Sequence, residues 1–151
     1  MSSKLAILGG TPVIDKCPDK LIHWPIVNDQ MRKDVLQVLE DGNMSGSDIS
    51  RKFEDGFAKW HNRKYALAHN TGTNALIAGF YGLEIGPGDE VIAPALTYWA
   101  SCLGVIHLGG SVVFCDVDPF TLQMDPDSLE SRITPRTKAI VVVHYKAYRA
   151  L

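Results

Sequence analysis

The chain has 151 residues, of which 46% are hydrophobic and 21% are charged. These proportions are ordinary for one globular domain and exclude disordered, collagen-like and low-complexity chains. Fifteen Lys and Arg residues against 17 Asp and Glu give a formal net charge of −2. The chain therefore lacks the basic field of a nucleic-acid-binding protein. Its longest apolar runs, such as residues 139–143, are far shorter than the ~20 residues of a membrane span.

The three cysteines, Cys17, Cys102 and Cys115, are an odd number and lack the spacing of a metal site. They predict reduced thiols in a cytoplasmic protein rather than a disulfide framework. Residues 1–8 contain a single lysine and too short an apolar run for a secretory signal. We expect a cytoplasmic protein without a metal ion and without a membrane or nucleic-acid partner.

Residues 1–26 form an irregular N-terminal segment in this interpretation, because glycine and proline punctuate it. Apolar residues at every fourth position predict an amphipathic helix over 27–39, capped by Asn28 and ended by Gly42. A polar, glycine-bearing loop separates it from a second helix expected over 49–60. We place the start of the domain proper at residue 27.

From residue 65 onward, short apolar strands alternate with helical patterns. The expected strands are 65–68, 90–93, 111–117 and 138–144, and the expected helices are 75–83, 96–108 and 128–133. This alternation indicates βαβ units with right-handed crossovers, and nearly continuous apolar strands indicate a parallel sheet covered on both faces. The predicted fold class is α/β.

The end of the chain departs from what a complete domain shows. It follows directly after a fully apolar strand, and a flat apolar sheet edge promotes aggregation. We expect the chain to be a truncated part of a larger domain.

Residues 70–76 are the first candidate site, since a strand leads there through a glycine turn into a helix N-terminus. Free backbone N–H groups, the positive helix end and the hydroxyls of Thr71 and Thr73 suit a phosphate. A simple capped helix is the alternative. The segment is neither a P-loop nor a GxGxxG dinucleotide motif.

Two further segments follow strand ends, where parallel sheets bind ligands. Tyr98 and Trp99 could stack on a flat cofactor ring, or could pack against the sheet. At helical spacing, only one of them can face a cleft. Asp116 and Asp118 could bind a metal or exchange protons, but such residues more often cap a turn.

Several segments, each weak alone, together carry a family resemblance. They are Leu8-Gly-Gly-Thr-Pro12, the loop 42–47, Ala68-His-Asn-Thr-Gly-Thr-Asn-Ala-Leu76, Gly86-Pro-Gly-Asp-Glu-Val-Ile-Ala-Pro94, Leu96-Thr-Tyr-Trp99, Gly109-Gly110, Asp116-Val-Asp118 and Ile133-Thr-Pro-Arg-Thr-Lys-Ala-Ile-Val-Val-Val-His144. In this order, over residues 7–145, they resemble the N-terminal part of the DegT/StrS-type aminotransferases. These are pyridoxal 5′-phosphate (PLP) enzymes of the aspartate aminotransferase fold, fold type I, that usually act on nucleotide-linked keto-sugars.

The resemblance implies that residues 27–151 are an incomplete N-terminal part of the PLP-binding large domain. It assigns Gly72 and Thr73 to the cofactor phosphate, through backbone N–H groups and a hydroxyl. It assigns Tyr98 to the aromatic position that stacks on the pyridine ring. A keto-sugar nucleotide as acceptor, glutamate as amino donor and a homodimer with shared active sites are also implied.

The resemblance assigns no catalytic residue to this chain. In the family, an aspartate that pairs with the pyridinium nitrogen and a Schiff-base lysine come later than the 151 residues present here. Residues 146–151 also depart from the family pattern. In that fold, later strands separate the strand at 65–68 from the next three, so it would lack partners. We expect the isolated chain to be inactive and to fold poorly or associate.

Two other functions stay open. Some relatives replace the lysine by histidine and dehydrate sugars, and that position lies outside the chain. A non-catalytic remnant that binds a phosphate-bearing ligand, or pairs with a full-length homologue, is the alternative from another class.

Overall fold

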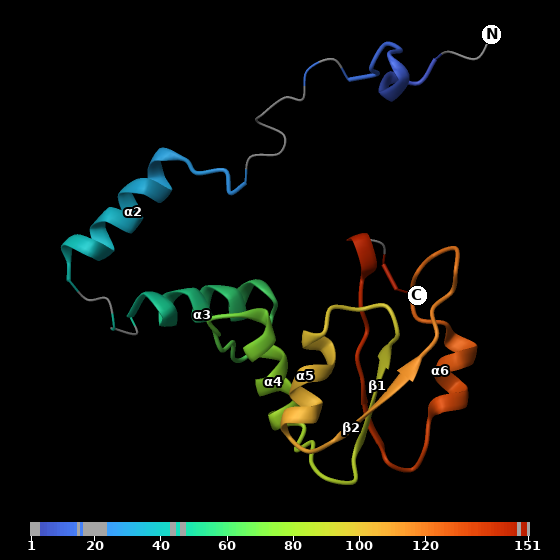
Figure 1. The fold of residues 1–151 in the computed structure, drawn as a ribbon. Helices are drawn as coiled ribbons and strands as arrows, with labels where there is room; N and C mark the ends of the chain where they lie inside the picture. Colours follow the sequence, from blue (N-terminus) through green and yellow to red (C-terminus); the bar gives the residue numbers. More distant parts are fainter. Residues whose placement is uncertain are drawn as a thin grey trace. The chain divides into compact units, whose positions relative to one another are not determined.

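The computed structural model describes residues 4–14, 16, 24–42, 45, 48–147 and 149–150. Cys17, and most of the loop expected over 42–47, therefore lie outside the described residues. The chain divides into two compact units, residues 1–48 and 49–151, and each is described by itself (Figure 1). Among the described residues, no helix has the length and apolar character needed to cross a bilayer.

The first unit contains a short 3-10 turn, η1 (Ala6–Leu8), and the helix α2 (Asp29–Glu40). The side chain of Asn28 accepts a hydrogen bond of 2.8 Å from the backbone N–H of Met31, which confirms the predicted cap. Such a cap satisfies one of the four free N–H groups of a helix start. Gly42 follows the helix with φ +65, a conformation that glycine adopts without strain.

The second unit contains the sheet and the helices that cover it. Its elements are α3 (Asp48–Trp60), α4 (Gly72–Gly82), β1 (Glu90–Pro94), α5 (Ala100–His107), β2 (Ser111–Cys115), α6 (Pro126–Arg132), β3 (Thr137–Ile140) and the 3-10 turn η2 (Tyr145–Ala147). The strands are parallel in the order β2-β1-β3. The α/β class with a parallel sheet is thereby confirmed.

Helices α4 and α5 lie on one side of the strands, and α6 lies on the other (Figure 1). The core packs the first two helices onto the sheet through Phe80, Ile85, Val91 and Val105. β1 is buried along its whole length because it has a strand on each side. β2 and β3 are edges, so Phe114 and Ile140 keep 55% and 41% of their surface exposed. The expected cover on both faces therefore holds for β1 alone.

The prediction of a strand over 65–68 is wrong. This segment is irregular, and Tyr65 and Leu67 are 77% and 73% exposed. The N–H of Ala68 donates to the carboxylate of Glu54 on α3, at 2.8 Å, instead of to a neighbouring strand. A strand is stable only with a partner for its backbone groups, and the described sheet offers none here.

Other boundaries also differ. α4 begins at Gly72 rather than at residue 75, and α6 begins at Pro126 rather than at residue 128. The helix expected over 96–108 begins only at Ala100, and β2 ends at Cys115 rather than at residue 117. The last strand, expected over 138–144, ends at Ile140, although the N–H of Val141 still donates to the carbonyl of Ile92 at 2.8 Å.

An ion pair closes the end of the sheet at which the strands begin. The Glu90 carboxylate accepts hydrogen bonds of 2.5 Å from the hydroxyl of Thr134 and from the guanidinium of Arg136. The Thr134 hydrogen bond and the Arg136 guanidinium lower the pKa of Glu90, and desolvation opposes them. The pair joins the first residue of β1 to the turn that leads into β3.

Candidate functional site

A cavity of about 580 Å³ lies between the N-terminus of α4 and the start of α5. Its lining residues are Gly72, Thr73, Ala75, Leu76, Tyr98, Ala100 and Ser101. The three residues that the sequence singled out for a cofactor, Gly72, Thr73 and Tyr98, therefore line one cavity. They come from two segments, more than 20 residues apart, that the packing of α4 on α5 brings together.

The N-terminus of α4 leaves backbone donors for a ligand. Thr71 is the N-cap, and its hydroxyl accepts from the N–H of Asn74 at 3.1 Å. The first intrahelical bond runs from the N–H of Ala75 to the carbonyl of Thr71. The N–H groups of Gly72 and Thr73 come before this bond, at the positive end of the helix dipole. The capped-helix interpretation is thus correct for Thr71 and leaves these two amides available to an anion.

Two glycines lie on the helices that border the cavity. A Cβ at Gly72 would meet no atom within 4 Å, so a ligand can approach this backbone closely. A Cβ at Gly104 on α5 would stand 2.7 Å from the ring of Phe80 and 3.1 Å from the Cα of Ile77. Because glycine stands there, α5 can pack tightly on α4, the helix whose N-terminus lines the cavity.

Tyr98 and Trp99 precede α5 and are not part of it. Their ring centroids are 5.4 Å apart, and the residues are 64% and 56% exposed. Such exposure contradicts the alternative that both pack against the sheet. Tyr98 lines the cavity, whereas Trp99 is not among the lining residues. The exposed ring of Tyr98 can offer a flat apolar face to a ring bound in the cavity.

Sequence reasoning missed Ser101, which lines the same cavity and is only 7% exposed. Its hydroxyl lies 2.7 Å from the hydroxyl of Thr97. A signal was present, since Thr97 and Ser101 are four residues apart in a segment with a helical pattern, where such residues share a face. The sequence interpretation considered only the adjacent aromatic residues, Tyr98 and Trp99, in this segment.

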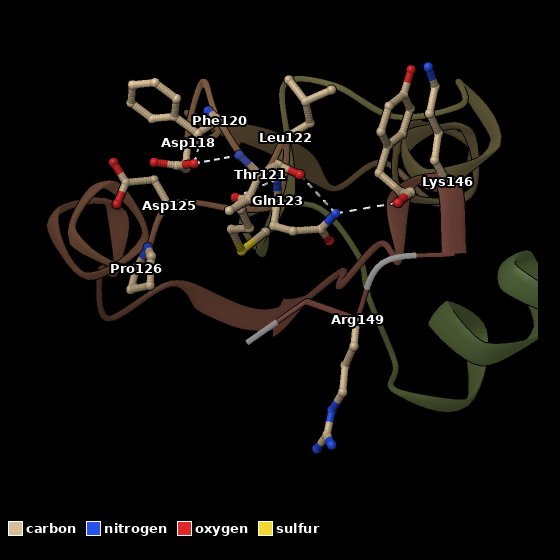
Figure 2. A pocket seen from close by; sticks show the side chains of 11 residues that line it. Asp118, Phe120, Thr121, Leu122, Gln123, Asp125, Pro126, Lys146 and Arg149 are labelled. Carbon is tan, nitrogen blue, oxygen red and sulfur yellow. Dashed lines mark hydrogen bonds between the residues drawn. The ribbon is translucent and has the colours of Figure 1, made fainter.

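A second cavity, of about 660 Å³, lies between residues 118–126 and the turn η2 (Figure 2). Figure 2 shows Gln123 between the loop and this turn, where its side-chain amide donates to the carbonyls of Thr121 at 3.3 Å and Tyr145 at 3.4 Å. Gln123 is 6% exposed, and its Oε1 has no hydrogen-bond partner among the described residues. Gln123 therefore ties the loop after β2 to the turn after β3.

The acidic pair beside this second cavity has structural partners. The Asp118 carboxylate accepts from the N–H groups of Phe120 at 3.0 Å and Thr121 at 2.6 Å. These hydrogen bonds, above all those of Thr121, lower the pKa of Asp118. Asp116 accepts from the Ser128 hydroxyl at 3.3 Å. The interpretation of Asp118 as a turn cap is confirmed, and no group of metal-ligating side chains gathers within the described part of the chain.

Comparisons with known proteins show the family to which the chain belongs. Residues 25–147 match the model of the DegT/DnrJ/EryC1/StrS aminotransferase family. The chain is 39% identical, over 153 residues, to the L-glutamine:2-deoxy-scyllo-inosose aminotransferase of Streptomyces kanamyceticus. That match covers 97% of this chain and 35% of the relative.

Solved structures of two related proteins superpose on the chain. An aminotransferase from Psychrobacter cryohalolentis gives a TM-score of 0.76 at 37% identity. The match covers 85% of this chain and 33% of the chain of that aminotransferase. The GDP-4-keto-6-deoxy-D-mannose-3-dehydratase of E. coli, with bound hydrated PLP, gives a TM-score of 0.73 at 28% identity. This match covers 80% of the present chain and 32% of the dehydratase chain. The chain thus spans about a third of the length of these relatives.

Proposed function

Because the chain belongs to the DegT/DnrJ/EryC1/StrS aminotransferase family, we propose that it forms the phosphate-binding and ring-stacking part of a PLP site. PLP is the cofactor of this family and of its structural relatives. One observation carries the proposal: Gly72 and Thr73 line the same cavity as Tyr98.

The residues present fit two parts of the cofactor. The amides of Gly72 and Thr73, at the N-terminus of α4, suit its phosphate dianion. The Thr73 hydroxyl is a further donor for that phosphate. The ring of Tyr98 suits the flat pyridine, which it would cover on one face. When bound, PLP supplies the electron sink that amino-group transfer needs. The residues of this chain would bind and orient it, and Tyr98 would exclude water from one face of its ring.

For the whole protein, we propose transfer of an amino group from glutamate to a keto-sugar nucleotide. The family and the relatives named as aminotransferases support the reaction class, and the E. coli relative is named for a nucleotide-linked keto-sugar. The Streptomyces relative is named for L-glutamine, so glutamate and glutamine should be compared as donors. The proton-moving lysine and the pyridinium aspartate are assigned by the resemblance to positions after residue 151, so the chain alone is inactive in this proposal. Its setting is a cytoplasmic homodimer.

Binding of pyridoxamine 5′-phosphate to the whole protein tests the proposed site. This amino form of the cofactor has no aldehyde, so it does not react with surface lysines. We expect Thr73→Ala and Tyr98→Ala each to raise the dissociation constant by about tenfold, as lost hydrogen-bonding or stacking partners do. Thr11→Ala, at an exposed position of the first unit, is the control. Equal affinity of all four proteins would contradict the proposed site.

The E. coli relative also favours a second candidate function, PLP-dependent sugar dehydration in the same fold. The products of the whole protein separate the two, because an aminotransferase yields an amino-sugar and a dehydratase yields a deoxygenated sugar without new nitrogen. A non-catalytic remnant gives a third pattern: it binds inorganic phosphate as tightly as pyridoxamine 5′-phosphate and forms neither product.

A further inference from the structure

The start of α5, next to the cavity, lacks an ordinary helix cap. Trp99 stands at the N-cap position with φ −52 and ψ −27, which are helical values, and its side chain makes no capping bond. Caps normally have extended backbone and a side-chain oxygen that accepts from the first turn. Here the N–H of Ser101 donates to the carbonyl of Tyr98 at 3.0 Å, and the N–H of Cys102 to that of Trp99. Tyr98 therefore belongs to a tight turn that backbone hydrogen bonds close and that no capping side chain of Trp99 reinforces.

A pair of hydroxyls spans this turn. Thr97 and Ser101 lie on either side of Tyr98, and their Oγ atoms are 2.7 Å apart. The Thr97 hydroxyl also lies 3.5 Å from the carbonyl of Tyr98, at the limit of a hydrogen bond. Ser101 is 7% exposed, so water competes little for its hydroxyl. Removing the Thr97 hydroxyl would leave the hydroxyl of buried Ser101 without this partner, which is unfavourable.

Side-chain packing does not fix the Tyr98 ring. The residue is 64% exposed, and its ring lies beside that of Trp99, itself 56% exposed. Where packing is this slight, the backbone of the turn decides where the ring lies. The hydrogen bond between the Thr97 and Ser101 hydroxyls stabilises this turn. Ser101 also lines the cavity together with Tyr98.

We propose that Thr97 and Ser101 are positioning residues that hold the ring of Tyr98 over the cofactor cavity. This inference rests on the proposed function, because it gives the ring a ligand to cover. The pair does not bind the phosphate, which belongs to the N-terminus of α4. It acts through Tyr98 and through the turn that carries Tyr98.

The test is a double-mutant cycle on the whole protein, with pyridoxamine 5′-phosphate and inorganic phosphate as probes. Thr97→Val keeps the shape and removes the hydroxyl, and Thr97→Ser keeps the hydroxyl. Ser101→Ala removes the other member of the pair. Ser131→Ala, which removes a hydroxyl bonded within α6, is the matched control. Far-UV circular dichroism confirms that each variant keeps its helices.

We expect Thr97→Val and Ser101→Ala each to weaken pyridoxamine 5′-phosphate binding by about three- to tenfold, as coupled neighbours do. Thr97→Ser should restore most of the affinity. In a Tyr98→Ala background, the two substitutions should have no further effect, because the ring they position is gone. Affinity for inorganic phosphate should not change.

Three results would overturn the inference. Full affinity in Thr97→Val and Ser101→Ala, while Tyr98→Ala still weakens binding, would reject the positioning role and leave the proposed function intact. An equal loss of inorganic phosphate binding would make Ser101 part of the phosphate site instead. Unchanged affinity in Tyr98→Ala and Thr73→Ala would reject the proposed function itself.

Discussion

Two neighbouring stretches of the chain, 65–68 and 71–76, differ in whether the secondary structure expected from sequence forms. Both were expected to be ordered, one as a strand and one as a helix start. The helix start forms because Thr71 caps it through the N–H of Asn74, within the same turn. Residues 65–68 stay irregular because their backbone groups find no neighbouring strand. Elements closed by local hydrogen bonds form from local sequence, whereas strands require partners from elsewhere in the polypeptide.

The largest expected effect comes from comparing two apolar side chains that the sequence treats alike. Val91 on β1 is fully buried, and Leu67 in the irregular segment is 73% exposed. Val91→Ala should lower the free energy of unfolding by about 2–3 kcal/mol. Leu67→Ala should change it by less than about 0.5 kcal/mol. Urea denaturation of both variants measures the contrast, and equal losses would show that residues 65–68 are packed after all.

The second prediction concerns the packing of α5 on α4. Gly104→Ala places a methyl group against Phe80 and Ile77, so we expect a loss of about 1–3 kcal/mol in unfolding free energy. Gly79→Ala, on α4, is the matched control, because a Cβ there meets no atom within 4 Å. It should stabilise the helix by about 0.5–1 kcal/mol. If both substitutions stabilise the protein, α5 does not pack on α4 as closely as described.

Two threonines of one turn separate stability from binding. Thr71→Ala removes the cap of α4 and should cost about 1 kcal/mol in thermal or urea unfolding. Thr73→Ala should change stability by less than about 0.5 kcal/mol, because its side chain makes no hydrogen bond to another described residue, and yet should weaken cofactor binding. The reverse assignment of the two effects would contradict the described cap.

The smallest effect is a dependence of stability on pH. The pKa of Glu90 is lowered by the Thr134 hydrogen bond and by Arg136, so the folded state favours its charged form. This contribution is complete above the unfolded pKa of about 4.3 and is lost as the pH falls through the folded pKa. Urea midpoints between pH 7 and pH 3 should fall less steeply in Glu90→Gln than in the unsubstituted chain. Asp89 and Asp118 also have lowered pKa values, so a shallower slope remains.

Glu40→Gln, at the exposed end of α2, is the control for this titration. It should leave the slope between pH 7 and pH 3 unchanged. An unaltered slope in Glu90→Gln would mean that the pair with Arg136 adds nothing to stability in solution.

Sequence predicted the fold where local chemistry decides it. The predicted cap Asn28 stands where α2 begins, and the parallel sheet followed from the alternation of strands and helices. The pattern failed at 96–99, which reads as helix but is a turn held by Thr97 and Ser101. The periodicity of apolar residues does not reveal a hydrogen bond between two hydroxyls such as those of Thr97 and Ser101.

For the candidate site, too, the local sequence predicted one part, whereas tertiary packing determines the other. The glycine turn before a helix predicted a phosphate site at residues 70–76, with a capped helix as the alternative, and the family resemblance assigned the phosphate to Gly72 and Thr73. The pairing of this site with Tyr98 depends on the tertiary packing of α5 on α4, which periodicity does not specify. The choice of PLP came from the family resemblance, and Ser101 emerged only from the structure.

The most direct measurement is a titration of the ¹⁵N-labelled whole protein with pyridoxamine 5′-phosphate, followed by amide NMR shifts. The account predicts that the amides of Gly72 and Thr73 move most, and that inorganic phosphate moves the same two. The residues around Tyr98 should respond to pyridoxamine 5′-phosphate alone. If the amides of Gly72 and Thr73 stay fixed while others move, the cofactor phosphate is not held at the start of α4.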